Sequence, residues 1–177
     1  MSSADRTVPG LTVRLTTVAD WQAWRDLRLR SLQESPDAFG STYAREAAFT
    51  DEEWRDRARG PAPGPVLEVQ ARGPAVLAWA GDRPVGMGGG YSDLPGWLHV
   101  IAMWTDPAWR GRGVGEAVVG FLVDWAGERG MRVHLDVEAG NAGARRLYER
   151  CGFTATGESR PLRDGSAHRC ERMVLPA

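Results

Sequence analysis

The fold is decided by one stretch, Val100-Ile-Ala-Met-Trp-Thr-Asp-Pro-Ala-Trp-Arg-Gly-Arg-Gly-Val-Gly-Glu-Ala-Val-Val119. Its apolar run ends at Thr105, because the following Asp106-Pro107 contains a proline, which lacks a backbone N–H and restricts the residue before it. A glycine-rich segment follows, and apolar residues then recur at helical spacing as far as Trp125. The stretch therefore predicts a strand, a glycine loop and a helix, in that order.

The glycine loop predicts a site for a phosphorylated ligand. The first N–H groups of a helix have no internal partner and carry the positive end of the helix dipole. Glycines let a ligand approach the backbone, and Arg110 and Arg112 flank the loop. The chain has no lysine, which excludes a kinase-type P-loop. Glu116 and Val118 stand where a dinucleotide fingerprint requires its third glycine, so that motif fails as well.

A second stretch repeats the order of a strand followed by a helix, between Leu135 and Phe153. It contains Asn141-x-x-Ala144-x-x-Leu147-Tyr148-x-x-x-Gly152-Phe153. Together with Arg110-x-x-Gly113-x-Gly115, it resembles the two coenzyme A motifs of the Gcn5-related N-acetyltransferases (GNAT). The resemblance is close over residues 97–153 and looser over residues 12–175. It implies acetyl-CoA as the cosubstrate.

The resemblance also implies which residues bind the cosubstrate. The pyrophosphate loop corresponds to Arg110, Gly111, Arg112, Gly113, Val114 and Gly115. Backbone groups at Met103, Trp104 and Thr105 would hold the pantetheine and the thioester. The side chains of Met103 and Trp104 could at the same time be ordinary core residues. Asn141, a favoured helix N-cap in its own right, would bond the pantetheine. Arg145 or Arg146 would reach the nucleotide end, with Arg145 preferred because Arg146 is better explained as part of a solvated helix face.

Two side chains are candidates for proton transfer. Tyr148 corresponds to the family tyrosine beside the sulfur, and a phenol is a plausible proton donor to a departing thiolate. His99 stands where the family often has a glutamate, on a strand face expected to carry Trp97, His99, Ile101 and Met103. Imidazole titrates near neutrality, so His99 is a candidate base, acting directly or through water. A histidine satisfied by its neighbours in a half-buried strand is the other interpretation.

The acceptor pocket is the least specified part of the site. By analogy with the family it is built by the first two helices, their connecting loop and the last hairpin, where Phe39, Tyr43 and Trp54 are the candidate substrate-binding residues. Glu46 could attract a cation, whereas the acids at 51–53 are better explained as helix N-terminal residues. None of these residues identifies the acceptor amine.

Composition limits the remaining possibilities. A chain of 177 residues is long enough for one domain, here expected over 11–177 after a flexible tail at 1–10. A net charge of −1 argues against a nucleic-acid or membrane partner. The two cysteines form no disulfide framework, which favours a cytoplasmic location. No metal is expected, and a homodimer is expected only by analogy with the family.

The order of predicted elements is strand, two helices, three strands, helix, strand, helix and two strands. This order predicts an α/β fold with a mixed sheet of six to seven strands and helices on both faces. The resemblance adds a pair of splayed central strands, in the three-layer GNAT arrangement. Residues 60–65, Gly-Pro-Ala-Pro-Gly-Pro, interrupt regular secondary structure and are expected to be a mobile loop.

These observations predict an N-acetyltransferase that moves an acetyl group from acetyl-CoA to a primary amine in a ternary complex. A small-molecule amine is the first expectation, because no broad charged track suggests a protein partner. Acetylation of protein or peptide N-termini is the enzymatic alternative. A non-catalytic acyl-CoA sensor is the other, since His99 replaces the family's glutamate.

Overall fold

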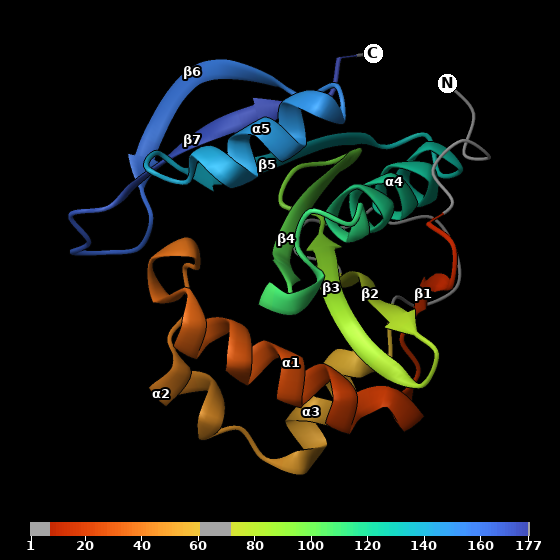
Figure 1. The fold of residues 1–177 in the computed structure, drawn as a ribbon. Coiled ribbons are helices and arrows are strands. Elements are labelled where there is room, and N and C mark those ends of the chain that lie inside the picture. The colour runs from red at the N-terminus through yellow and green to blue at the C-terminus, as the bar shows by residue number, and fades with distance from the viewer. Residues whose placement is uncertain (1–7, 61–71, 177) are drawn as a thin grey trace.

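The structure is a computed structural model that describes residues 8–60 and 72–176 (Figure 1). Its sheet has seven strands in the order β1-β2-β3-β4-β5-β7-β6. The strands are β1 (Leu11–Leu15), β2 (Arg72–Ala80), β3 (Arg83–Tyr91), β4 (Trp97–Thr105), β5 (Arg132–Glu138), β6 (Thr154–Pro161) and β7 (Arg169–Val174). The α-helices are α1 (Trp21–Glu34), α2 (Tyr43–Ala47), α3 (Asp51–Ala58), α4 (Val114–Gly127) and α5 (Ala142–Arg150).

Helices cover both faces of the sheet, as the sequence predicts. Helices α1 and α3 pack on one face, where Trp24, Leu27 and Trp54 meet Leu77 and Met87 of the sheet. Helices α4 and α5 pack on the other face. That core contains residues of both helices and of strands β2 to β5, and its buried members include Val76, Val85, Leu98, Val118, Leu122, Leu135 and Tyr148. The three-layer mixed α/β arrangement is therefore confirmed.

Strands β4 and β5 separate halfway along their length. Their parallel pairing runs only from Trp97↔Arg132 to Val100↔Leu135, although β4 continues to Thr105. Beyond this point the backbone of β4 faces no partner on the β5 side. The splayed pair that the resemblance implies is therefore present, and it opens next to the start of α4 (Figure 1).

A bulge in β4 changes which side chains face which layer. The pairing of β3 with β4 shifts register between Gly89↔Ile101 and Met87↔Trp104, and Ala102 has a positive φ of 56°. One extra residue in a strand inverts the alternation that follows it. The face predicted for Trp97, His99, Ile101 and Met103 is consequently wrong at Met103, which packs in the core of α4, while Trp104 joins the core of α1.

The helices begin at capping residues that can be recognised in the sequence. Thr50 and Glu53 form the capping box that starts α3, and the side chain of Asn141 accepts a hydrogen bond from the Ala144 N–H at 3.0 Å to start α5. Gly113 caps α4 in the left-handed conformation, with a φ of 79°. Glycine adopts this conformation without the steric cost that a Cβ would bring.

The sequence pattern does not predict α2, since five residues are too few to show apolar periodicity. The predicted element order is otherwise confirmed. Residues 1–7 of the predicted tail and 61–65 of the predicted loop lie outside the described residues. Within the described ranges, no helix combines the length and the apolar character that crossing a bilayer requires.

Candidate functional site

A cavity of about 660 Å³ opens where β4 and β5 separate. It lies between the end of β4, the start of α4 and the first turns of α5, and it reaches the turn after α1. The lining residues are Ser35, Ala38, Phe39, Met103, Trp104, Thr105, Trp109, Arg110, Gly111, Gly113, Val114, Gly115, Glu116, Asn141, Gly143, Ala144, Arg146, Leu147, Tyr148 and Arg150. Most of the residues predicted for the cosubstrate are thereby brought together.

The glycine loop forms one end of this cavity. The Gly113 carbonyl accepts the first helical hydrogen bond, from the Ala117 N–H at 3.0 Å, so the preceding N–H groups of the first turn have no partner within the helix. Gly115 lies against α5, where an added Cβ would come within 2.9 Å of the Leu147 side chain. The loop therefore offers N–H groups to an anion and lets α4 and α5 pack closely.

Arg110 is held by the end of α1. Its Nη2 lies 2.7 Å from Glu34 Oε2, and its Nε donates to the Thr105 carbonyl at 3.2 Å. Glu34 also accepts a hydrogen bond from Trp104 Nε1 at 3.0 Å. Hydrogen bonds from Arg110 and Ser35 lower the pKa of Glu34 to about 2, so this carboxylate is a weak base at neutral pH. Arg112 instead stacks over the Trp109 ring at 5.0 Å.

The bulge and the last helix form the other end of the cavity. Met103, Trp104 and Thr105 line it at the point where β4 has left β5, so their backbone groups are not used by that pairing. Asn141 lines the same space while it caps α5. Both roles considered for Asn141, a helix cap and a ligand contact, are compatible with this position.

Tyr148 lies on α5 and lines the cavity from a buried position. Its ring packs edge-on against Phe153, with the centroids 6.1 Å apart. Burial raises the pKa of the Tyr148 phenol well above its ordinary value. The hydroxyl is therefore protonated at neutral pH, which is the state that a proton donor needs.

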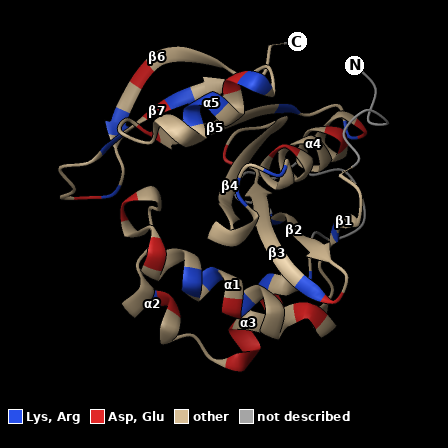
Figure 2. Cartoon of the chain, in the orientation of Figure 1, with Lys and Arg blue, Asp and Glu red and all other residues tan. Residues whose placement is uncertain are grey.

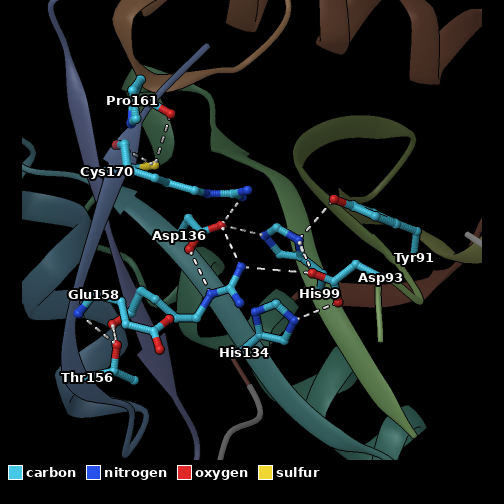
Figure 3. A network of polar contacts seen from close by, with 11 residues as sticks. Tyr91, Asp93, His99, His134, Asp136, Thr156, Glu158, Pro161 and Cys170 are labelled. Atoms are coloured by element: carbon cyan, nitrogen blue, oxygen red, sulfur yellow. Dashed lines mark hydrogen bonds and ion pairs between the residues drawn. The ribbon is translucent and has the colours of Figure 1, made fainter. Parts of the chain in front are cut away.

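His99 does not line the cavity. Its Nδ1 lies 3.0 Å from the Tyr91 hydroxyl and 3.3 Å from Asp93, and its Nε2 lies 3.1 Å from Asp136. Burial alone would raise the pKa of Asp136, but hydrogen bonds from His99 and Arg172 hold it well below its usual value. Both ring nitrogens of His99 are thus occupied by side chains of the protein (Figure 3).

The two arginines considered for the nucleotide end differ in position. Arg145 is paired with Glu171 and lies 3.9 Å from Glu149, and it is not a lining residue. Arg146, the next residue of α5, lines the cavity. The structure therefore reverses the preference for Arg145 over Arg146. A helix turns 100° per residue, so neighbouring side chains face different directions.

The predicted acceptor residues separate into three environments. Phe39 lines the cavity, whereas Tyr43 is exposed on α2 outside it. Trp54 is 1% exposed and packs against Phe49 in the core, so its side chain does not line the cavity. Glu46 is equally unavailable, because it is buried in a two-point ion pair with Arg28 at 2.8 and 2.9 Å.

Six lining residues are not predicted from the sequence, namely Ser35, Ala38, Trp109, Glu116, Gly143 and Arg150. Ser35 and Ala38 belong to the turn around Pro36–Ala38 that follows α1, and Trp109 ends the turn at Pro107–Trp109. The prolines of these two turns signal a break in the chain, but they do not indicate which side chains turn inward.

Comparison with known proteins identifies the family to which this cavity and its motifs belong. The acetyltransferase (GNAT) family model matches residues 21–153. A mycothiol acetyltransferase from Nocardiopsis dassonvillei is 29% identical over 140 residues, which cover 76% of this chain and 39% of the relative. A mycothiol acetyltransferase from Mycobacterium avium is 37% identical over 70 residues, 35% of this chain and 22% of the relative. The chain thus spans well under half the length of these two relatives.

A solved structure shares the whole fold. The GCN5-related N-acetyltransferase from Kribbella flavida superposes with a TM-score of 0.73 at 24% identity, over 97% of this chain and 100% of that one. At this level of identity the likeness supports the fold alone. The family match, which extends over both the glycine loop and the Asn141 motif, decides the family. The chain belongs to the GNAT acetyltransferase family.

Proposed function

We propose that this chain transfers an acetyl group from acetyl-CoA to the primary amine of a small molecule, in a ternary complex without an acyl-enzyme intermediate. One observation carries the proposal. A single cavity runs from the glycine loop past the β4 bulge to Tyr148 and Phe39, so a thioester and an amine can meet inside it. Holding both reactants in contact supplies much of the rate acceleration in such a reaction.

Each part of the cavity has one task in this mechanism. The N–H groups at the start of α4 bind the pyrophosphate of acetyl-CoA. The backbone of β4 at Met103–Thr105 orients the pantetheine and donates to the thioester carbonyl, where negative charge develops. The amine nitrogen then forms a bond to the carbonyl carbon and the carbon–sulfur bond breaks. The Tyr148 hydroxyl gives its proton to the departing sulfur.

A water is the base in this mechanism, not His99. His99 lies outside the cavity lining, and both of its ring nitrogens contact protein side chains. Glu34 is close to Trp104, but its depressed pKa makes it a poor proton acceptor. The amine therefore loses its proton to solvent through the open side of the cavity. This is the alternative that the sequence leaves open beside His99.

Three observations support a small-molecule acceptor. Arg163, from the connection between β6 and β7, donates to the Phe39 carbonyl at 3.1 Å and to the Pro36 carbonyl at 3.4 Å, which ties that connection to the turn after α1. Charges of both signs are mixed along the described helices in Figure 2. These helices therefore present no continuous surface of one charge that would attract a protein partner. The names of the two curated relatives specify mycothiol.

The proposal is tested by mixing the protein with acetyl-CoA, a panel of amines and a thiol reagent. We expect release of CoA that depends on one class of small amine, with an equal amount of N-acetylated product by mass spectrometry. Peptides with free N-termini are included as competitors. Release of CoA with peptides alone would show that the acceptor is a polypeptide and not a small molecule. Tight CoA binding without release for any acceptor would mean that the chain is a sensor.

A further inference from the structure

Two buried histidines and an aspartate meet at the closed end of the β4–β5 pair. His99 and His134 are direct partners in the parallel register, and Asp93 comes from the turn between β3 and β4. The two imidazole rings are stacked with centroids 4.5 Å apart, and their side chains are almost fully buried. One donor atom from each of the three residues lies within 4.8 Å of the other two (Figure 3).

Each ring nitrogen of His99 lies beside a carboxylate. Asp136 is held by Arg172 Nε at 3.2 Å and by Arg160, and it lies 3.1 Å from His99 Nε2. On the other side of the ring, His99 Nδ1 lies 3.3 Å from Asp93 Oδ2 and 3.0 Å from the Tyr91 hydroxyl, so two oxygen atoms are within reach of this nitrogen.

The separations from Asp93 are close to those in a metal site. His134 Nε2 lies 2.8 Å from Asp93 Oδ1. Adjacent ligands of a tetrahedral zinc ion with bonds of about 2.0–2.1 Å are ~3.3 Å apart. The planes of the stacked imidazole rings differ by only 26°, so the rings would turn on metal binding to direct both lone pairs at one ion. Asp136 supplies the outer carboxylate that commonly orients a metal-bound histidine. The Asp93 side chain retains 22% exposure, which gives a metal a route of entry and an open coordination position.

We propose that Asp93, His99 and His134 bind one zinc ion, with Asp136 as the orienting carboxylate of His99. The metal would join the turn after β3 to the first halves of β4 and β5. It would lie next to Val100 and Leu135, where the pairing of the two strands ends. Its role is to hold the strands together at the closed end and so to fix the width of the opening for the cosubstrate.

This site is independent of the acetyl-transfer chemistry. The three ligands lie outside the cavity lining, and the proposed mechanism uses none of them. Positions 93, 99 and 134 form no short metal-binding motif, so the sequence alone does not indicate this site. Arg172 lies 3.9 Å from Asp93 but 3.2 Å from Asp136, so the main partner of its charge is the outer carboxylate.

The test is a calorimetric titration of chelator-treated protein with zinc chloride. We expect one zinc ion per chain and a rise in the thermal unfolding midpoint on zinc addition. Asp93→Asn keeps the shape of the side chain and removes the anionic ligand, so it should weaken zinc binding by ~100-fold or more. His168→Ala is the matched control, since the third histidine of the chain contacts Asp37 and Glu138 elsewhere and should not affect zinc binding.

Cobalt as a substitute metal reports the ligands directly. Bound Co²⁺ should give visible d–d absorption without a thiolate charge-transfer band in the wild type and in His168→Ala, but not in Asp93→Asn. If Asp93→Asn fails to fold, His134→Asn serves the same purpose. The proposal is overturned if the wild type shows no saturable zinc binding, if Asp93→Asn binds as well as the wild type, or if a thiolate band places the metal on a cysteine.

Discussion

Replacing Tyr148 with phenylalanine is expected to lower kcat for acetyl transfer by ~100-fold and to leave the Kd for CoA within about threefold, as for loss of a general acid. The reason is the position of the hydroxyl. Tyr148 lines the cavity near the end of β4, and burial keeps its phenol protonated. Phenylalanine preserves the ring packing against Phe153, so the change removes the proton donor and little else.

Steady-state kinetics and a calorimetric titration with CoA, carried out on the same preparation, test this expectation. Tyr43→Phe is the matched control, because Tyr43 is an exposed tyrosine outside the cavity and should retain wild-type kcat. Unchanged kcat in Tyr148→Phe would exclude Tyr148 as the acid. A parallel loss of CoA affinity would instead assign it a role in binding.

Replacing Gly113 with alanine is expected to raise the Kd for CoA by roughly tenfold or more, which corresponds to about 1.4 kcal/mol. Gly113 has a φ of 79° at the N-cap of α4, and an L-residue in this left-handed conformation costs about 1–2 kcal/mol. Relief of that strain rotates the first N–H groups of α4 away from the anion. The added Cβ would also lie 3.0 Å from the Val8 side chain.

A variant at a second glycine distinguishes the effect of backbone strain from an effect on CoA binding. Gly81 has a φ of 59° in the turn between β2 and β3, in open space and away from the cavity. Gly81→Ala should therefore lower the thermal midpoint by an amount similar to Gly113→Ala without changing the Kd for CoA. Equal CoA affinity in wild type and Gly113→Ala would contradict the assignment of the loop as the pyrophosphate site.

Local sequence rules predict the cosubstrate half of this protein well. The glycine loop, the Asn141 cap and the capping box at Thr50 each depend on a few consecutive residues, whose conformations follow from their own side chains. The two motifs are also local, so the family and the α/β fold can be assigned before any tertiary contact is known.

Long-range packing explains the parts that the sequence does not predict. The β4 bulge depends on pairing with β3, and no local signal indicates that Ala102 takes a positive φ. His99 meets His134 and Asp136 only because β5 lies beside β4, and it meets Asp93 through the turn that joins β3 to β4. Trp54 follows the same logic, since an aromatic residue on a short helix fits a pocket wall or a core equally well until α1 is placed against it.

The most direct test of the whole assignment is a crystal structure of the protein grown with CoA. We expect pyrophosphate density on the N–H groups at the start of α4, pantetheine between the separated ends of β4 and β5, and the sulfur beside the Tyr148 hydroxyl. CoA bound elsewhere, or strands paired along their full length with no space between them, would contradict this assignment.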